Sequence, residues 1–160
     1  MIVIGIDPGL SGGIAILQPG AFPEAFPMPT VSEGKKRGLD LQRLRGLLLG
    51  ASMYAIEKAQ PMPKQGVTSC FNYGKVYGVL MAMSWMNGSV IEVRPQEWQR
   101  EFGITRASGG KERAISVAMK LFPGTSLLAT ERCRKAHDGM ADALLIAEWC
   151  RRKVGTHGTG

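Results

Sequence analysis

Short apolar runs separated by turn residues predict three successive strands in the first part of the chain. Met1–Ile6 is an apolar, β-branched run that ends just before Asp7, and Ile14–Leu17 is a second run that follows a glycine turn. In Phe22–Met28 aromatic residues alternate with proline, which fits a strand only at the edge of a sheet. These three segments are expected to form an antiparallel meander.

Helix and strand patterns alternate through the rest of the chain. The expected elements up to the middle of the chain are a polar, basic loop at Ser32–Gly38, a helix capped by Asp40 that runs to about Leu49, a strand at Tyr54–Ile56, an irregular segment at Ala59–Thr68, and an apolar helix capped by Ser69 that ends near Met86. Those that follow are a strand at Val90–Val93, a helix from Pro95 to about Phe102, a flexible loop at Ile104–Gly110, an amphipathic helix at Lys111–Phe122, and a final helix from Asp138 to about Arg152.

The order of these elements predicts the fold class. A meander followed by alternating strands and helices indicates one α/β domain with a mixed central sheet flanked by helices. A chain of 160 residues has room for one such domain, which we place at residues 1–153, with residues 154–160 as a disordered tail.

The apolar helix after Ser69 carries a stripe of small residues. Cys70, Gly74, Gly78 and Ala82 recur at every fourth position and therefore share one face of the helix. Such a stripe lets another backbone approach closely. The sequence leaves two partners open, the protein's own sheet and a second copy of the chain.

Composition excludes several classes of protein. With 44% hydrophobic and 21% charged residues the chain can build a core and a soluble surface, which excludes a disordered or collagenous protein. Its apolar stretches are far too short to span a bilayer, and no signal-peptide pattern is present, so we expect a cytoplasmic protein without a membrane partner. Three cysteines without a paired CxxC spacing indicate neither a disulfide framework nor a structural zinc site.

Charge narrows the class of partner. The formal net charge is +7, and twelve of the twenty basic residues lie between Arg94 and Lys153. A basic excess concentrated in one half of the chain favours a polyanionic partner, and nucleic acid most of all. The competing interpretation is a surface whose charges only keep the protein soluble.

Four carboxylates occupy positions where a charge is costly unless it binds something. Asp7 and Glu57 each end an apolar strand, and in an α/β sheet ligands bind at adjacent strand ends. Asp138 and Asp142 are four residues apart and therefore lie on the same side of the final helix. Each has an ordinary alternative role, as a turn former, a strand end on the surface or a helix cap.

The chemistry of these side chains points to a divalent cation. Hard oxygen ligands without a cysteine or histidine cluster favour Mg²⁺, or Mn²⁺ in its place, over zinc. Four convergent carboxylates can hold two ions per active site, the arrangement used for in-line hydrolysis of phosphodiesters. Together with the basic surface, this pattern predicts a nuclease.

The residues that carry these features resemble one family in chain order. The segment Ile4–Gly12 (IGIDPGLSG) is similar to the first-strand motif of RuvC-type Holliday junction resolvases. Ile56-Glu57 and the helix with Gly74 and Gly78 are similar to the second acidic motif, and Gly109–Glu112 falls at the family's glycine-rich loop and lysine. His137–Leu144 (HDGMADAL) resembles the C-terminal acidic helix, with a spacing closer to phage-type and chloroplast-type relatives.

The resemblance implies a fold, a reaction and a set of site residues. It implies an RNase H-like fold and a homodimer that nicks a four-way DNA junction at paired positions, in recombination, repair or phage DNA processing. Asp7, Glu57, Asp138 and Asp142 would hold the metal ions, with Asp138 preferred to His137. Lys111 would approach the scissile phosphate as a further catalytic residue.

The same resemblance directs attention to DNA-binding and dimer residues. We expect four basic side chains, Lys64, Arg106, Lys111 and Arg113, to contact DNA. Met62 and Phe71 could wedge against opened bases at the crossover, although Phe71 fits the core equally well. Gly74, Gly78 and Ala82 are the predicted dimer interface. The expected location is the cytoplasm of a bacterial or phage-infected cell, with an organellar homologue as the alternative.

Three other functions compete with junction resolution. The opening Ile6–Gly9 also resembles the Asp-Gly phosphate turn on the first strand of sugar-kinase and actin-type ATPases, but those proteins need two such lobes and a second glycine-rich motif, so no nucleotide cofactor is expected. A non-catalytic junction-binding protein would leave the buried aspartates unexplained. Another RNase H-like nuclease, acting on branched DNA or on an RNA–DNA hybrid, is the closest rival, because a metal site alone does not select the substrate.

Overall fold

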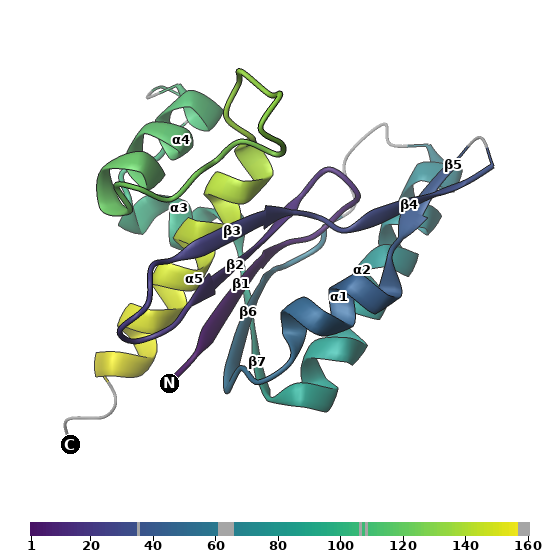
Figure 1. Ribbon diagram of the computed structural model, residues 1–160, viewed down its shortest axis with the longest axis horizontal. Coiled ribbons are helices and arrows are strands. Elements are labelled where there is room, and N and C mark those ends of the chain that lie inside the picture. Colours follow the sequence, from purple (N-terminus) through teal and green to yellow (C-terminus); the bar gives the residue numbers. More distant parts are fainter. Residues whose placement is uncertain (35, 61–65, 106, 108, 157–160) are drawn as a thin grey trace.

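A computed structural model of the chain describes residues 1–34, 36–60, 66–105, 107 and 109–156. Five strands form one mixed sheet in the order β3-β2-β1-β6-β7 (Figure 1). Their bounds are β1 Val3–Asp7, β2 Gly13–Leu17, β3 Glu24–Pro27, β6 Met53–Glu57 and β7 Ser89–Val93. The first three pair antiparallel as the predicted meander, whereas β6 and β7 run parallel to β1. The predicted edge position of the third strand is confirmed.

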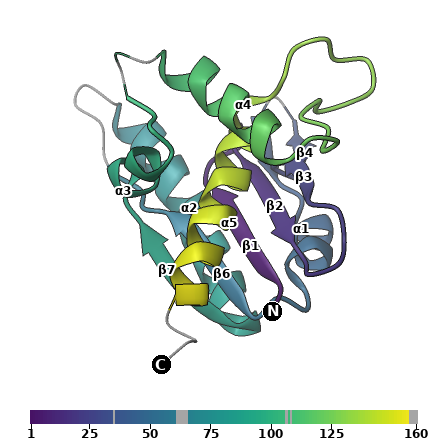
Figure 2. The ribbon, with the colours of Figure 1, turned by 90° about the vertical axis from the view of Figure 1, so that its left-hand side faces the viewer.

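Helices cover both faces of this sheet, as the strand pattern requires. On one face lie α1 (Leu41–Leu48) and α2 (Val67–Asn87); on the other lie α3 (Pro95–Glu101), α4 (Gly110–Leu121) and α5 (Asp138–Thr156). Figure 2 shows α5 crossing the sheet over β1 and β2. None of the helices in the described ranges is long and apolar enough to cross a membrane.

Burial on both faces explains why the first strand is a continuous apolar run. Ile4 and Ile6 point toward α1 and α2, and they belong to a core cluster with Leu44 and Leu80. Val3 belongs to the opposite cluster beneath α5, because side chains alternate between faces along a strand. The period-two pattern therefore decides which cluster each residue joins.

Three local predictions differ from the structure. The segment expected as a basic loop forms most of a hairpin of β4 (Thr30–Glu33) and β5 (Lys36–Leu39). The two strands are held by backbone pairing, which does not require a pattern of apolar side chains. Helix α2 begins at Val67 with Gly66 at its N-cap, so Ser69 lies inside the first turn and is not the cap. Helix α5 continues to Thr156, beyond the predicted boundary at residue 153; residues 157–160 lie outside the described part.

Helix α5 lies so close to β1 that only glycine fits at the contact. A Cβ atom added to Gly5 would overlap the backbone oxygen of Ala143 and the backbone nitrogen of Ala147. Because both obstacles belong to the helix backbone, no side-chain rotation relieves the clash. The distance between sheet and helix, and with it the position of the first turns of α5, depends on this residue.

We expect Gly5→Ala to lower the free energy of unfolding by about 2–3 kcal/mol, the usual cost of overpacking a core. Gly46→Ala is the matched control, since Gly46 lies within α1 with open space around its Cα. There, alanine should raise stability by up to about 1 kcal/mol through its helix propensity. Urea unfolding of both variants tests the contact, and equal stabilities would contradict it.

Candidate active site

Asp7 and Glu57 lie side by side where the two central strands of the sheet end. We call this end of the sheet, together with Asp138 and Asp142, the acidic edge. They end the neighbouring parallel strands β1 and β6, in which Gly5 is paired with Ala55 and Ile6 with Ile56. Alternation places Asp7 on the same face as Gly5, and Glu57 on the same face as Ala55, which is the face covered by α5. The two strand-end carboxylates therefore point toward the helix that carries the acidic pair.

Helix α5 brings Asp138 and Asp142 to this edge because glycines allow its first turn to touch the sheet. A Cβ on Gly139 would come within 2.7 Å of the Cα of Gly12, and one on Gly13 within 2.9 Å of the Cα of Met140. The contact thus joins the β1–β2 turn directly to the start of α5. These glycines were not among the predicted site residues, although the run Gly12-Gly13 next to Asp7 is a visible signal.

The four carboxylates are close enough to perturb one another. Burial, with the charges of Asp142, Glu57 and Asp138, raises the pKa of Asp7 well above its ordinary range. Burial and the charges of Glu57 and Asp138 raise the pKa of Asp142 to about 7. The structure therefore brings the four predicted carboxylates into one neighbourhood, and their role as metal ligands stays a prediction. The cluster carries more negative charge than the surrounding protein neutralises.

Two aromatic side chains that the sequence did not single out complete the site. Trp98 on α3 donates its indole N–H to Glu57 Oε2 at 2.8 Å, which holds that carboxylate and partly offsets the rise in its pKa that burial causes. Tyr73 on α2 lies against Gly9, and its pKa is raised to about 12 by burial and by the charges of Asp7 and Glu57. Both come from distant segments, and no local pattern marks them.

Lys111 reaches the acidic cluster from the first turn of α4. Its ammonium pairs with Asp138 Oδ2, and this hydrogen bond lowers the pKa of Asp138 and raises that of Lys111. The lysine side chain is 76% exposed, so its ammonium is open to solvent beside the carboxylates. His137 has another role: its Nδ1 accepts a hydrogen bond of 3.3 Å from the backbone N–H of Met140, at the start of α5. The choice of Asp138 over His137 as the fourth metal ligand stays a prediction.

For the phosphodiester cleavage that the sequence predicts, we expect Lys111→Ala to slow the reaction by about a hundredfold, on the scale of a single transition-state interaction, with little effect on stability. The matched control is Lys120→Ala, which removes the same side chain from the last turn of the same helix. Single-turnover rates and binding constants measured for both variants separate the two positions. Unchanged turnover and affinity in Lys111→Ala would leave this residue as an ordinary solvated lysine.

The donor set suits a hard divalent cation, but the side chains are not gathered around one. In the described part of the chain, no group of three or more carboxylate, histidine or cysteine side chains is arranged to hold a metal ion. Two features oppose a closer grouping. The like charges of the four carboxylates repel one another, and Lys111 already engages an oxygen of Asp138. Oxygen donors with raised pKa values at an open edge fit a cation that neutralises them, provided that the carboxylates draw together on binding.

The predicted DNA-binding residues fall into three groups. Arg113 is exposed on α4, two residues after Lys111 and therefore on another side of that helix. Phe71 is 72% exposed, which removes the interpretation that it belongs to the core. Met62, Lys64 and Arg106 lie outside the described residues.

The stripe of small residues on α2 does not pack on the protein's own sheet. Apart from the helix's own backbone, no atom of the described residues lies within 4 Å of a Cβ added at Gly74 or Gly78, and Ala82 is exposed. The same side of the helix exposes the large apolar side chains of Val67, Phe71 and Trp85. Of the two partners that the sequence left open, the sheet is therefore excluded, whereas the second copy of the chain stays a prediction.

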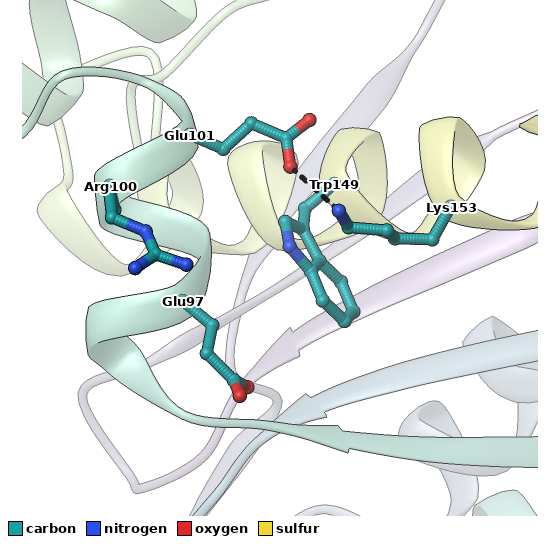
Figure 3. A pocket seen from close by; sticks show the side chains of 5 residues that line it. All are labelled: Glu97, Arg100, Glu101, Trp149 and Lys153. Atoms are coloured by element: carbon teal, nitrogen blue, oxygen red, sulfur yellow. Dashed lines mark ion pairs between the residues drawn. The ribbon is translucent and has the colours of Figure 1, made fainter.

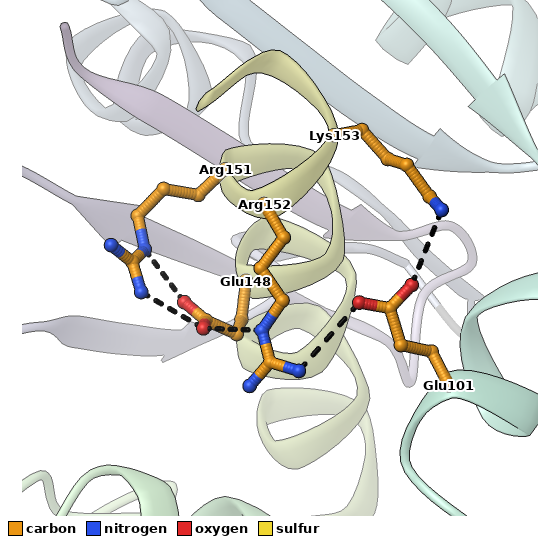
Figure 4. A network of polar contacts seen from close by, with 5 residues as sticks. All are labelled: Glu101, Glu148, Arg151, Arg152 and Lys153. Atoms are coloured by element: carbon orange, nitrogen blue, oxygen red, sulfur yellow. Dashed lines mark hydrogen bonds and ion pairs between the residues drawn. The ribbon is translucent and has the colours of Figure 1, made fainter. Parts of the chain in front are cut away.

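A second concave region lies toward the other end of α5 and has a different character. This pocket of about 400 Å³ is lined by Glu97, Arg100, Glu101, Trp149 and Lys153 (Figure 3). Glu101 pairs with Lys153 and Arg152, while the buried Glu148 binds both Arg151 and Arg152 (Figure 4). The acids here are matched by bases, in contrast to the unbalanced cluster around Asp7.

Comparison with known proteins bears on the fold and on the family resemblance. No protein-family model matches the chain. Over 82 residues, which make up 51% of this chain and 8% of the relative, the sequence is 38% identical to the chloroplastic Holliday junction resolvase MOC1 of Chlamydomonas reinhardtii. The match thus spans less than a tenth of that relative's length.

Solved structures extend the likeness over the whole chain. RuvC of Thermus thermophilus in complex with a Holliday junction substrate has a TM-score of 0.62 at 19% identity, covering 99% of this chain and 97% of its own. A second structure of Thermus thermophilus RuvC has a TM-score of 0.54 at 18% identity, covering 96% and 97% of the two chains. The chain therefore has the fold of RuvC, as its motifs implied, and its sequence resembles that of a Holliday junction resolvase.

Proposed function

We propose that this protein is a structure-specific endonuclease that resolves four-way DNA junctions by metal-dependent hydrolysis of phosphodiesters. The observation that carries the proposal is the unbalanced cluster of four carboxylates where two parallel strands and α5 meet, in a chain with the fold of RuvC. The sequence likeness to a Holliday junction resolvase supports the choice of substrate. The formal charge of +7 supports a polyanionic substrate.

Asp7, Glu57, Asp138 and Asp142 are the residues that would hold two Mg²⁺ ions, with Mn²⁺ as a substitute. When bound, the ions would supply an activated water and a counter-charge for the leaving 3′-oxygen. Trp98 keeps the Glu57 carboxylate in a fixed orientation through its indole N–H. The exposed ammonium of Lys111 can exchange its contact with Asp138 for one with the scissile phosphate.

A nicking assay tests the proposed function. Labelled four-way junction, plain duplex and RNA–DNA hybrid are incubated with the protein, each with Mg²⁺ and with a chelator. We expect nicks in the junction only when Mg²⁺ is present. Preferential cleavage of the hybrid would favour a ribonuclease of the same fold, and junction binding without cleavage would favour a non-catalytic binding protein.

The proposed reaction, which cuts a junction at two paired positions, favours a homodimer as the working form of the protein. A four-way junction has approximate two-fold symmetry, and two symmetric cuts need two active sites, which a two-fold dimer provides through one self-complementary patch. The exposed stripe on α2, with Gly74, Gly78 and Ala82 among larger apolar residues, is the proposed patch. Its small residues would let two helices approach closely.

We expect Gly78→Arg to convert a dimer into a monomer, because the new side chain would stand between the two helices. Sedimentation equilibrium should show the change, while the cleavage assay should show loss of paired nicks and retention of single ones. Gly46→Arg, on the exposed side of α1, is the control and should remain dimeric. A wild-type monomer bound to junction DNA would contradict this assembly.

The proposed biological setting is DNA recombination, repair or phage DNA processing. A cytoplasmic location stays a prediction from the sequence. The relative named above is chloroplastic, which keeps an organellar location as the alternative. Localisation of a tagged chain in the source cell distinguishes the two.

A further inference from the structure

The β4–β5 hairpin is a separate two-stranded sheet that projects beside the acidic edge. It follows β3 in the chain and pairs only with itself, with Ser32 opposite Arg37 (Figure 1). An isolated hairpin is marginally stable, so its contacts with the body of the protein matter. Its base is closed by a bond of 3.0 Å from the Asp40 N–H to the Pro29 carbonyl, and Leu39 packs against the core.

Arg37 ties this hairpin to the turn that follows Asp7. Its Nη2 donates to the carbonyl of Leu10 at 2.6 Å and lies 3.4 Å from Ser11 Oγ. The guanidinium has five N–H donors, more than these two contacts use. Ordering an exposed arginine costs side-chain entropy, which the two contacts must offset. Both contacts are made to the β1–β2 turn, where Gly12 lies against Asp7. These contacts therefore connect the hairpin to the turn that follows Asp7.

The charge of the hairpin complements a need of the acidic edge. Clustered carboxylates repel the phosphates of a DNA substrate, so basic groups beside them favour the binding of a duplex. Lys111, in the first turn of α4, occupies one side. The hairpin, with exposed Lys36 and Arg37, stands on the opposite side of the carboxyl end of β1 (Figure 1).

We propose that the β4–β5 hairpin is a second DNA-binding arm, which contacts the phosphates of one duplex arm of the junction. Arg37 couples this arm to the β1–β2 turn that follows Asp7. This inference rests on the proposed function. Lys36 is the phosphate contact. Arg37 is a positioning residue, since it acts on Asp7 through the β1–β2 turn. Strand alternation places Arg37 and Leu39 on the face toward the body and Lys36 on the outer face.

The test separates the two roles. Junction affinity of the full chain is measured in chelator at several salt concentrations, and single-turnover cleavage is measured in Mg²⁺ at saturating protein. Lys36→Gln should lower affinity and reduce the slope of log K against log[salt] by about 0.9 for each phosphate that the variant no longer binds, so that its deficit shrinks about 3.5-fold when salt rises fourfold. Its cleavage rate at saturation should equal that of the wild type.

Arg37→Lys keeps the charge but loses the forked donor geometry. It should keep the wild-type salt slope and cleave about tenfold more slowly at saturation, because a small displacement of a catalytic group has a large effect on rate. Arg100→Gln, which neutralises an exposed arginine beside Trp149, is the control and should match the wild type in both measurements. Thermal unfolding of each variant verifies that the fold is retained.

The results that would overturn the proposal for the hairpin differ from the result that would refute the proposed function. If Lys36→Gln binds like Arg100→Gln at every salt concentration, or if Arg37→Lys cleaves at the wild-type rate, the proposal for the hairpin is overturned. Loss of the dimer in either variant would make the hairpin a protein interface and would overturn it equally. A wild-type protein that neither prefers nor cleaves a four-way junction would instead refute the proposed function.

Discussion

Replacing Asp7 with asparagine is expected to abolish cleavage of a four-way junction while leaving junction binding intact. The substitution keeps the shape of the side chain and removes one of the four charges that would hold the metal ions. We expect the single-turnover rate to fall by about a thousandfold, in the range of a lost transition-state interaction. DNA affinity should change little, because phosphate contacts from the basic surface supply most of it.

The chain offers a matched control for this variant in Asp40→Asn. Asp40 caps α1 by accepting a hydrogen bond of 3.0 Å from the Arg43 N–H, a role that asparagine fills equally well. This variant should bind and cleave like the wild type. Near-normal nicking by Asp7→Asn in Mg²⁺, with the control equally active, would remove Asp7 from the metal site.

Replacing Asp142 with asparagine is expected to stabilise the metal-free protein at pH 8 while it abolishes cleavage. The pKa of Asp142 is about 7 in the folded chain, against an ordinary value of 3.8, because burial and the charges of Glu57 and Asp138 oppose ionisation. Over this interval the folded state binds more protons than the unfolded state. Stability from this group is therefore fully present below about pH 3.8 and is lost as pH rises through 7.

The size of this effect follows from the pKa shift. The difference between a pKa of 3.8 and one of about 7 corresponds to at most about 4 kcal/mol in the free energy of unfolding. The wild type loses this stability at pH 8, and the asparagine variant keeps it. Urea unfolding in chelator should therefore show a difference in stability at pH 8 that closes toward pH 4. Added Mg²⁺ should raise the melting temperature of the wild type at pH 8 more than that of the variant.

Two results would contradict this account. A variant that is less stable than the wild type at pH 8 in chelator would make Asp142 a structural residue. A stability difference that does not depend on pH would show that repulsion among the carboxylates is not its cause. Loss of cleavage together with a gain in stability is the combination expected of a functional charge held at an energetic cost.

The main features of the fold and the acidic residues of the site follow from local sequence patterns. Short continuous apolar runs predicted β1, β2 and β6, because strands buried on both faces need apolar side chains on both. Asp7 and Glu57 stood out because each follows such a run, where a lone carboxylate is costly. The spacing of Asp138 and Asp142 placed both on one side of a helix before any contact was known.

Tertiary structure alone decided how these parts meet. The sequence contains no local signal for the bond between Trp98 and Glu57, for the position of Tyr73, or for the pairing of Lys111 with Asp138, since each joins segments far apart in the chain. The stripe on α2 has the same spacing whether it faces a sheet or solvent, and only the packing of the helix shows that it is exposed.

The hairpin and the glycines show the same division. The segment 32–38 has a loop-like composition, yet residues 32–33 and 36–38 belong to strands β4 and β5, because backbone pairing does not depend on hydrophobic periodicity. Gly5 and Gly139 are ordinary small residues in the sequence, and their importance comes from the approach of α5 to the sheet. The sequence by itself determined which residues carry charge and which are apolar, because those are properties of single residues and local periods. Distances between segments depend on packing of the whole chain, and so the geometry of the site was decided only by the tertiary structure.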